Sequence, residues 1–91
     1  MKGNKRILLV DDDKGLADLI SIRLTAEGFQ VDVAYDGYTA LSMVSAFNPH
    51  VVVTDLKMNG MDGIQLVDAI HKQHPGLPII ILTAFGSIPV A

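Results

Sequence analysis

The run Val51–Asp55 constrains the fold of this chain more than any other stretch. It holds three consecutive valines, then a threonine, then a carboxylate. A short run that is apolar almost throughout is typical of a strand buried on both faces, as strands of parallel sheets are. Because open α/β folds place their chemistry outside the carboxyl ends of the strands, we expect Asp55 to be a functional residue.

The rest of the chain alternates between strand and helix patterns. Apolar residues recur at helical spacing after each of the first three predicted strands. The predicted strands cover residues 6–10, 29–34, 51–55 and 77–82. With short connections, this alternation predicts an α/β fold, a doubly wound parallel sheet with right-handed crossovers.

Local signals mark the ends of the helices. Asp13 and Asp36 are predicted N-caps, and Asp62 resembles the first residue of a capping box with Gln65. The first helix is predicted to end at Gly28 and the second at Asn48-Pro49. The apolar stripe expected to face the core in the third helix is Ile64, Val67 and Ile70.

Size and composition exclude several classes of function. The chain has 91 residues, of which 49% are apolar, so one compact domain is expected. A net charge of −3 gives no reason for this domain to bind nucleic acid or an anionic membrane. No apolar run reaches the roughly 20 residues of a membrane span, and the absence of cysteine excludes disulfides and thiolate sites. We therefore expect a soluble, cytoplasmic protein.

Acidic residues follow two of the predicted strands at the point where each strand ends. Asp11, Asp12 and Asp13 come directly after the first strand, and Asp55 closes the third. All strands of a parallel sheet end on the same side, so these carboxylates converge if the two strands are neighbours. Crowded carboxylates repel, and proteins keep such arrangements mainly where a cation or a shared proton relieves them. Oxygen ligands without nearby histidine or cysteine favour Mg²⁺, with Mn²⁺ as the alternative, at a site that acts on phosphate.

Each acid also has a plainer interpretation. Asp13 fits a helix cap better than a metal ligand. Asp11, Asp12 and Asp55 taken singly could be solvated loop acids, and only their expected convergence favours a metal. Two other phosphate sites fit poorly. The loop after the first strand lacks the G-x-G-x-x-G of a dinucleotide site, and a phosphatase D-x-D-x-T/V motif needs threonine or valine where Gly15 stands.

The remaining histidines and methionines are assigned no chemistry. His50, His71 and His74 show no metal-ligand spacing with the acids, and we expect His71 and His74 to be exposed on one helix face. Met58 and Met61 are expected to pack in the loop after the third strand.

Four stretches together resemble the receiver domain of two-component response regulators. Their order and spacing fit the family over nearly the whole chain, which implies a flavodoxin-like, CheY-like sheet and one receiver domain over residues 1–91. The stretches are Val10–Asp13, Asp55 with Met58, Gly60–Gly63 and Ile81–Ala84. The segment Thr83–Pro89 looks most like receivers of NtrC-type transcriptional activators, which implies an AAA+ and DNA-binding output domain that this chain lacks.

The resemblance also implies a mechanism. A sensor histidine kinase is the expected partner, and Asp55 is the expected acceptor of the phosphoryl group carried on its phosphohistidine. By the family pattern, Asp12 and Asp55 ligate Mg²⁺ directly, Lys57 does so through its backbone carbonyl, and Asp11 acts through water. The protein is then a phosphoacceptor signalling domain that catalyses at most its own phosphorylation and dephosphorylation.

The same pattern assigns a switch to the end of the fourth strand. Thr83 is expected to hydrogen-bond the phosphoryl group, and Ala84 to leave room for its approach. Asn59 stands where the family usually has proline, so the loop beside Asp55 is expected to be looser.

The C-terminal end departs from the family pattern. Four of the five βα units are expected here, and Ser87–Ala91 reads as the first turn of another helix. The family's fifth strand, with its phosphate-pairing lysine, and its last helix are expected to be missing. Ile79–Leu82 would then be a bare edge, which predicts a homodimer through the fourth strand. The missing lysine leaves an alternative function open, a phosphorylation-deficient interaction module.

Overall fold

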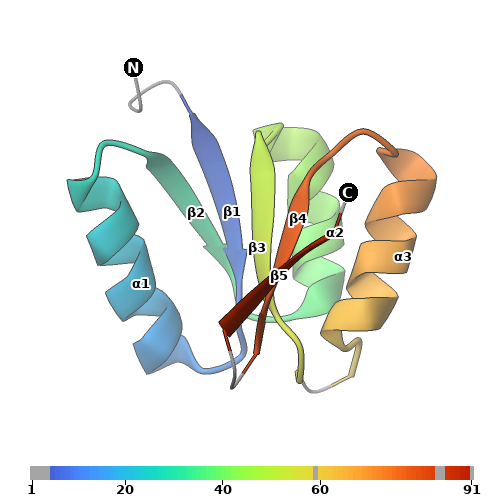
Figure 1. Ribbon diagram of the computed structural model, residues 1–91, viewed down its shortest axis with the longest axis horizontal. Helices are drawn as coiled ribbons and strands as arrows, with labels where there is room; N and C mark the ends of the chain where they lie inside the picture. The colour runs from blue at the N-terminus through green and yellow to red at the C-terminus, as the bar shows by residue number, and fades with distance from the viewer. Residues whose placement is uncertain (1–4, 59, 84–85, 91) are drawn as a thin grey trace.

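A five-stranded sheet in the order β2-β1-β3-β4-β5 forms the centre of the molecule, and its first four strands run parallel (Figure 1). The computed structural model describes the backbone of residues 5–58, 60–83 and 86–90, and the side chains of these as far as Leu82. The strands are β1 (Arg6–Val10), β2 (Gln30–Ala34), β3 (Val51–Asp55), β4 (Ile79–Thr83) and β5 (Gly86–Val90). The predicted α/β fold with a doubly wound parallel sheet is confirmed for β1 to β4.

Three helices in the described residues cover the two faces of this sheet. They are α1 (Lys14–Ala26), α2 (Gly37–Phe47) and α3 (Gly63–Gln73). Helix α1 lies on one face, and α2 and α3 lie side by side on the other (Figure 1). None of the helices in the described part of the chain is long and apolar enough to cross a membrane.

The predicted helix caps are confirmed. Asp13, Asp36 and Asp62 each accept a hydrogen bond from the backbone N–H three residues on, and Asp62 forms the full capping box with Gln65. Helix α2 ends at Asn48, whose φ of 52° is left-handed. These bonds satisfy donors that the first turn of a helix cannot pair internally.

Most of the core lies between the sheet and the α2–α3 layer. Its largest fully buried apolar side chains on that side are Leu8, Val10, Val44, Val52, Leu66, Ile70 and Ile79. The prediction for Ile64 is wrong, because this residue is 59% exposed in the first turn of α3 and Leu66 is buried instead. Helix α1 buries only Ala17 fully, and its Leu19 and Ile22 are 64% and 67% exposed. The sequence pattern of α1 predicted an apolar side but not how little of it the sheet would cover.

The C-terminal segment corrects two predictions. Gly86–Val90, where the first turn of a helix was predicted from Ser87, is strand β5 and pairs antiparallel with β4. Strand β4 is therefore paired on both sides, with β3 and with β5, so the predicted dimer edge is covered. Hydrogen bonds to β5 satisfy backbone groups of β4 that a bare edge would leave to water or to another chain. Ala91 lies outside the described residues.

Candidate functional site

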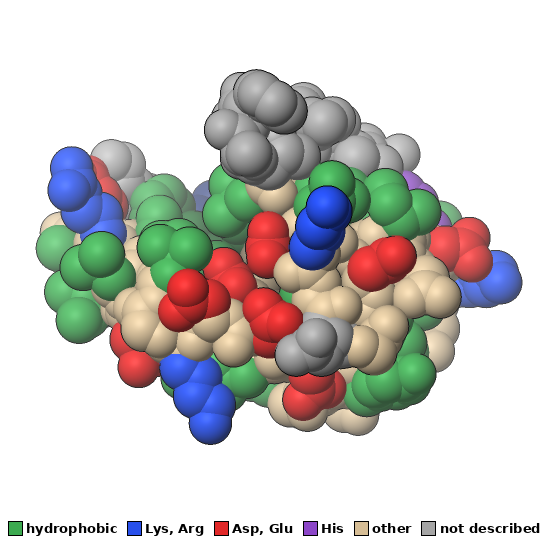
Figure 2. All heavy atoms as spheres, turned by 90° about the horizontal axis from the view of Figure 1, so that it is seen from below, with side chains coloured by type: hydrophobic (Ala, Val, Ile, Leu, Met, Phe, Trp, Pro, Cys, Tyr) green, Lys and Arg blue, Asp and Glu red, His purple; other side chains and the backbone are tan. Residues whose placement is uncertain are grey.

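The pairing of β1 with β3 determines the geometry of the candidate site. Val10 lies opposite Thr54 in this parallel register, so the next residues, Asp11 and Asp55, emerge beside each other at the carboxyl edge of the sheet. Acidic side chains gather near the middle of that edge in Figure 2, which views the molecule from below. The condition set for the carboxylates to converge, that these two strands are neighbours, is therefore met.

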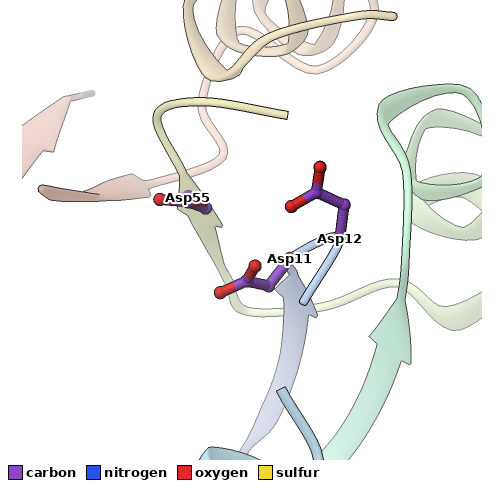
Figure 3. Close-up of side chains that lie close together, drawn as sticks. All are labelled: Asp11, Asp12 and Asp55. Atoms are coloured by element: carbon purple, nitrogen blue, oxygen red, sulfur yellow. The ribbon is translucent and has the colours of Figure 1, made fainter. Parts of the chain in front are cut away.

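Asp11, Asp12 and Asp55 form one group, here called the acidic cluster (Figure 3). One carboxylate oxygen from each lies within 4.8 Å of the others. Asp11 is buried, at 3% exposure, whereas Asp12 and Asp55 are half-buried. Asp13 is not part of this group, since its side chain caps α1.

Burial makes the negative charge of Asp11 costly. Desolvation raises the pKa of the Asp11 carboxyl, and the charges of Asp55, Asp12 and Asp13 raise it further. One opposing contact lowers the pKa, a hydrogen bond of 3.0 Å from the backbone N–H of Asp13 to Asp11 Oδ1. The buried Asp11 carboxylate is therefore destabilised by desolvation and by its acidic neighbours, and a cation bound beside it would relieve this cost.

The donor set of the cluster fits a hard divalent cation. All three side chains offer carboxylate oxygens, which suit Mg²⁺ or Mn²⁺ and not softer metals. Three protein ligands would leave positions for water and phosphate oxygens, as is usual for Mg²⁺ at phosphoryl sites.

Asp55 is held by its neighbours in the chain. Its Oδ1 accepts a hydrogen bond of 2.9 Å from the N–H of Leu56, and its backbone carbonyl accepts one of 3.0 Å from the Thr54 hydroxyl. Thr54 is fully buried, and the N–H of Leu56 also donates to the carbonyl of Leu82 in β4. Both β3 and β4 thus fix the backbone at this residue.

Lys57 and the backbone of Thr83 are the other predicted site residues that the structure describes. Lys57 is exposed two residues after Asp55, and its backbone carbonyl stays a predicted ligand. Thr83 ends β4 opposite Gly86, but its side chain lies outside the described residues, as does the whole of Ala84.

Two residues next to Asp55 were missed in the sequence. Gly63 and Thr54 both approach the Asp55 carbonyl oxygen. The sequence does carry a signal for each residue: Gly63 directly follows a predicted N-cap, and Thr54 is the one hydroxyl in an apolar strand. Neither signal identifies the atom that the residue contacts. Met58 and Met61 pack against the core, as predicted.

The exposed positions predicted for His71 and His74 are wrong. Both side chains are half-buried, and the Nε2 atom of each is buried without a hydrogen-bond partner among the described residues. The sequence shows that the two histidines share a helix face but not how far tertiary packing covers that face.

Known proteins share this arrangement. The family model described as the response regulator receiver domain matches residues 7–91. The transcriptional regulatory protein GlrR of Escherichia coli is 49% identical over 85 residues, which are 93% of this chain and 19% of GlrR. The DNA-binding response regulator MtrA of Mycobacterium tuberculosis is 44% identical over 80 residues, 88% of this chain and 35% of MtrA. The chain thus spans a minor part of these relatives.

Solved structures agree with the sequence relatives. The receiver domain of a Francisella response regulator superposes with a TM-score of 0.83 at 38% identity, covering 89% of this chain and 67% of that one. The response regulator TrrA of Thermotoga maritima, solved in complex with Mg(2+)-BeF, gives 0.84 at 36% identity, with 88% and 70% covered. With the family match, the fold and the acidic cluster in agreement, the chain belongs to the response regulator receiver domains, which are phosphoacceptor signalling modules.

Proposed function

We propose that Asp55 accepts a phosphoryl group from a phosphohistidine of a sensor histidine kinase, and that the domain thereby controls a transcriptional output. The observation that carries the proposal is the acidic cluster, three carboxylates within 4.8 Å at the carboxyl ends of two neighbouring strands. Such a group is well suited to gather positive charge around an incoming phosphate.

The transfer requires no covalent step beyond the attack of Asp55 itself. An Asp55 carboxylate oxygen attacks phosphorus, and the new P–O bond forms as the P–N bond breaks. The imidazole leaves as a neutral base, because its other ring nitrogen already carries a proton. The N–H of Leu56 already holds Oδ1, which favours Oδ2 as the attacking atom. The contribution of the domain is then to orient one carboxylate and to hold its neighbours at the right distance.

The remaining residues have supporting roles in this proposal. Asp12, Asp55 and the Lys57 carbonyl would hold the cation directly, and Asp11 would hold it through water. When bound, Mg²⁺ supplies positive charge that offsets the repulsion between the carboxylates and the phosphoryl oxygens. Thr83 would donate its hydroxyl to the phosphoryl group once it is attached, and the small side chain of Ala84 would leave space for it.

The relatives support the transcriptional output. GlrR is named a transcriptional regulatory protein and MtrA a DNA-binding response regulator, and most of each lies beyond the part that matches this chain. By this analogy the receiver controls a DNA-binding output, and direct contact with DNA is not a task of the receiver itself.

The first test is chemical labelling. Wild type incubated with acetyl phosphate and Mg²⁺ should gain the mass of one phosphoryl group, and Asp55→Ala should gain none. Asp68→Ala is the matched control, because Asp68 is an exposed acid paired with Lys72 on α3, away from the cluster. Labelling of Asp55→Ala would contradict the assignment of the acceptor.

The second test is a Mg²⁺ titration of the unphosphorylated protein. Asp12→Ala should lower the affinity at least as much as the loss of an outer-shell partner does, which is about 10- to 100-fold, because it removes a direct ligand. An unchanged affinity would refute the metal assignment. A wild type that binds Mg²⁺ but takes no label would favour the phosphorylation-deficient interaction module.

A further inference from the structure

Two residues outside the acidic cluster lie close to the backbone carbonyl of Asp55. The buried hydroxyl of Thr54 donates to the carbonyl oxygen at 3.0 Å. Gly63, the first residue of α3, is also buried and approaches the same oxygen. These contacts act on the backbone that carries the Asp55 carboxylate.

Gly63 lies so close to β3 that no side chain fits there. A Cβ atom at this position would lie 2.5 Å from the Asp55 carbonyl oxygen and 3.0 Å from the Cα of Leu56. Both neighbours are backbone atoms of the strand end, so neither can rotate away as a side chain would. The N–H of Gly63 also donates to the Leu56 carbonyl at 2.8 Å, which draws the helix onto the strand.

Helix α3 cannot easily retreat from this contact. Its first turn is held together by the capping box, in which Asp62 and Gln65 exchange hydrogen bonds of 2.9 and 3.0 Å, so this turn moves as one unit with the helix. Leu66 and Ile70, one and two turns further on, are fully buried in the core. An added methyl group at residue 63 would therefore force the first turn of α3 and the backbone of Asp55 apart, because neither side of the contact can move without losing packing or hydrogen bonds.

We propose that Gly63 and Thr54 are positioning residues for the phosphoacceptor. Gly63 lets the first turn of α3 seat directly on the Asp55 carbonyl, and Thr54 holds the same oxygen from inside the core. Together they fix the distance between the Asp55 carboxylate and the carboxylates of Asp11 and Asp12. This inference rests on the proposed function, since it explains how that site keeps its geometry.

The test at residue 63 is Gly63→Ala, with Gly76→Ala as its matched control. A Cβ at Gly76 meets no atom within 4 Å, so the same change there should leave the site unaltered. Gly63→Ala should lower both Mg²⁺ affinity and the rate of labelling by acetyl phosphate by about 10- to 100-fold, as expected when a supporting contact is lost. Both are measured below the unfolding temperature, with circular dichroism confirming that the variant is folded.

The test at residue 54 separates position from stability. Thr54→Val keeps the shape of the side chain but removes the hydroxyl, and should lower Mg²⁺ affinity by about 5-fold, the equivalent of one neutral hydrogen bond. Thr54→Ser keeps the hydroxyl and should restore the affinity. A purely structural role for these residues would change the unfolding temperature and leave both affinity and labelling rate as in wild type, and that result would overturn the inference.

Failure of the inference differs from failure of the proposed function. If wild type binds Mg²⁺ but is not labelled, the function is wrong, while weaker Mg²⁺ binding in Gly63→Ala would still support the positioning role. If wild type is labelled and Gly63→Ala matches it in rate and affinity, the positioning role is wrong and the function stands. If wild type binds no Mg²⁺, both are overturned.

Discussion

The carboxyl edge and the amino edge of the parallel sheet use charged side chains in opposite ways. At the carboxyl edge, Asp11, Asp12 and Asp55 bring like charges within 4.8 Å. At the amino edge, the Arg6 guanidinium donates through Nε to the carbonyls of Phe47 and Asn48, at 3.1 and 2.9 Å. One edge crowds like charges together, whereas the other uses its charge to hydrogen-bond the end of α2 to β1. Binding capacity and stability are thus placed at opposite ends of the same strands.

The largest expected effect on stability is at the amino edge. Arg6→Ala should lower the free energy of unfolding by about 1.5–3 kcal/mol, the range for hydrogen bonds made by a charged group. Urea denaturation at neutral pH measures the loss, and Arg23→Ala on α1 serves as a control of equal charge. Equal losses in the two variants, or weaker Mg²⁺ binding in Arg6→Ala, would erase the distinction between the edges.

A smaller effect of opposite sign is expected at the carboxyl edge. Asp11→Asn keeps an oxygen to accept the hydrogen bond from Asp13 but removes a buried charge, and should raise the unfolding free energy of the metal-free protein by about 1 kcal/mol. Because burial raises the pKa of the Asp11 carboxyl, the folded state binds its proton more tightly than the unfolded chain does. The contribution of Asp11 to the free energy of unfolding therefore falls as the pH rises through the pKa of its carboxyl. The Asp11→Asn protein should lack that part of the pH dependence. A destabilised Asp11→Asn protein at neutral pH would show that the carboxylate is compensated after all.

The smallest effect expected comes from His50 at the amino edge. Its Nδ1 accepts a hydrogen bond of 3.0 Å from the N–H of Arg6, which requires a neutral ring. Local desolvation, followed by the charges of Arg6 and Lys5, lowers the pKa of the exposed His50 below its ordinary 6.5. As the pH falls, the unfolded chain therefore takes up the proton before the folded protein does. The contribution of neutral His50 to the free energy of unfolding is present above about pH 6.5 and is lost as the pH falls through the lowered pKa of the folded state. The difference in urea midpoint between wild type and His50→Ala should shrink over that range, and a constant difference would exclude the protonation effect.

The features that follow from short-range rules were predictable from the sequence. The caps at Asp13, Asp36 and Asp62 join residues three positions apart, so residue type and spacing in the sequence are enough to locate them. The convergence of Asp11 and Asp55 needed one rule more, that parallel strands end at a common edge.

The features that depend on tertiary packing were not predictable. Ile64 and Leu66 are both apolar and close together, and only the seating of α3 decides which one is buried. Ser87 and Pro89 suit the first turn of a helix as well as an edge strand, and β4 supplies the hydrogen bonds that select the strand. The closeness of Gly63 to Asp55 likewise arises from how a helix packs on a strand and has no local pattern.

A contact between α2 and the loop before α3 limits how this protein can vary. A Cβ atom at Gly37 would lie 2.8 Å from the Cβ of Met61, whose Cγ and Sδ lie 3.0 Å away. Position 37 and position 61 therefore share one small volume, and a larger residue at the first demands a smaller or displaced residue at the second. Substitutions at the two positions should be strongly non-additive. Across related sequences, the pair is expected to change together or not at all.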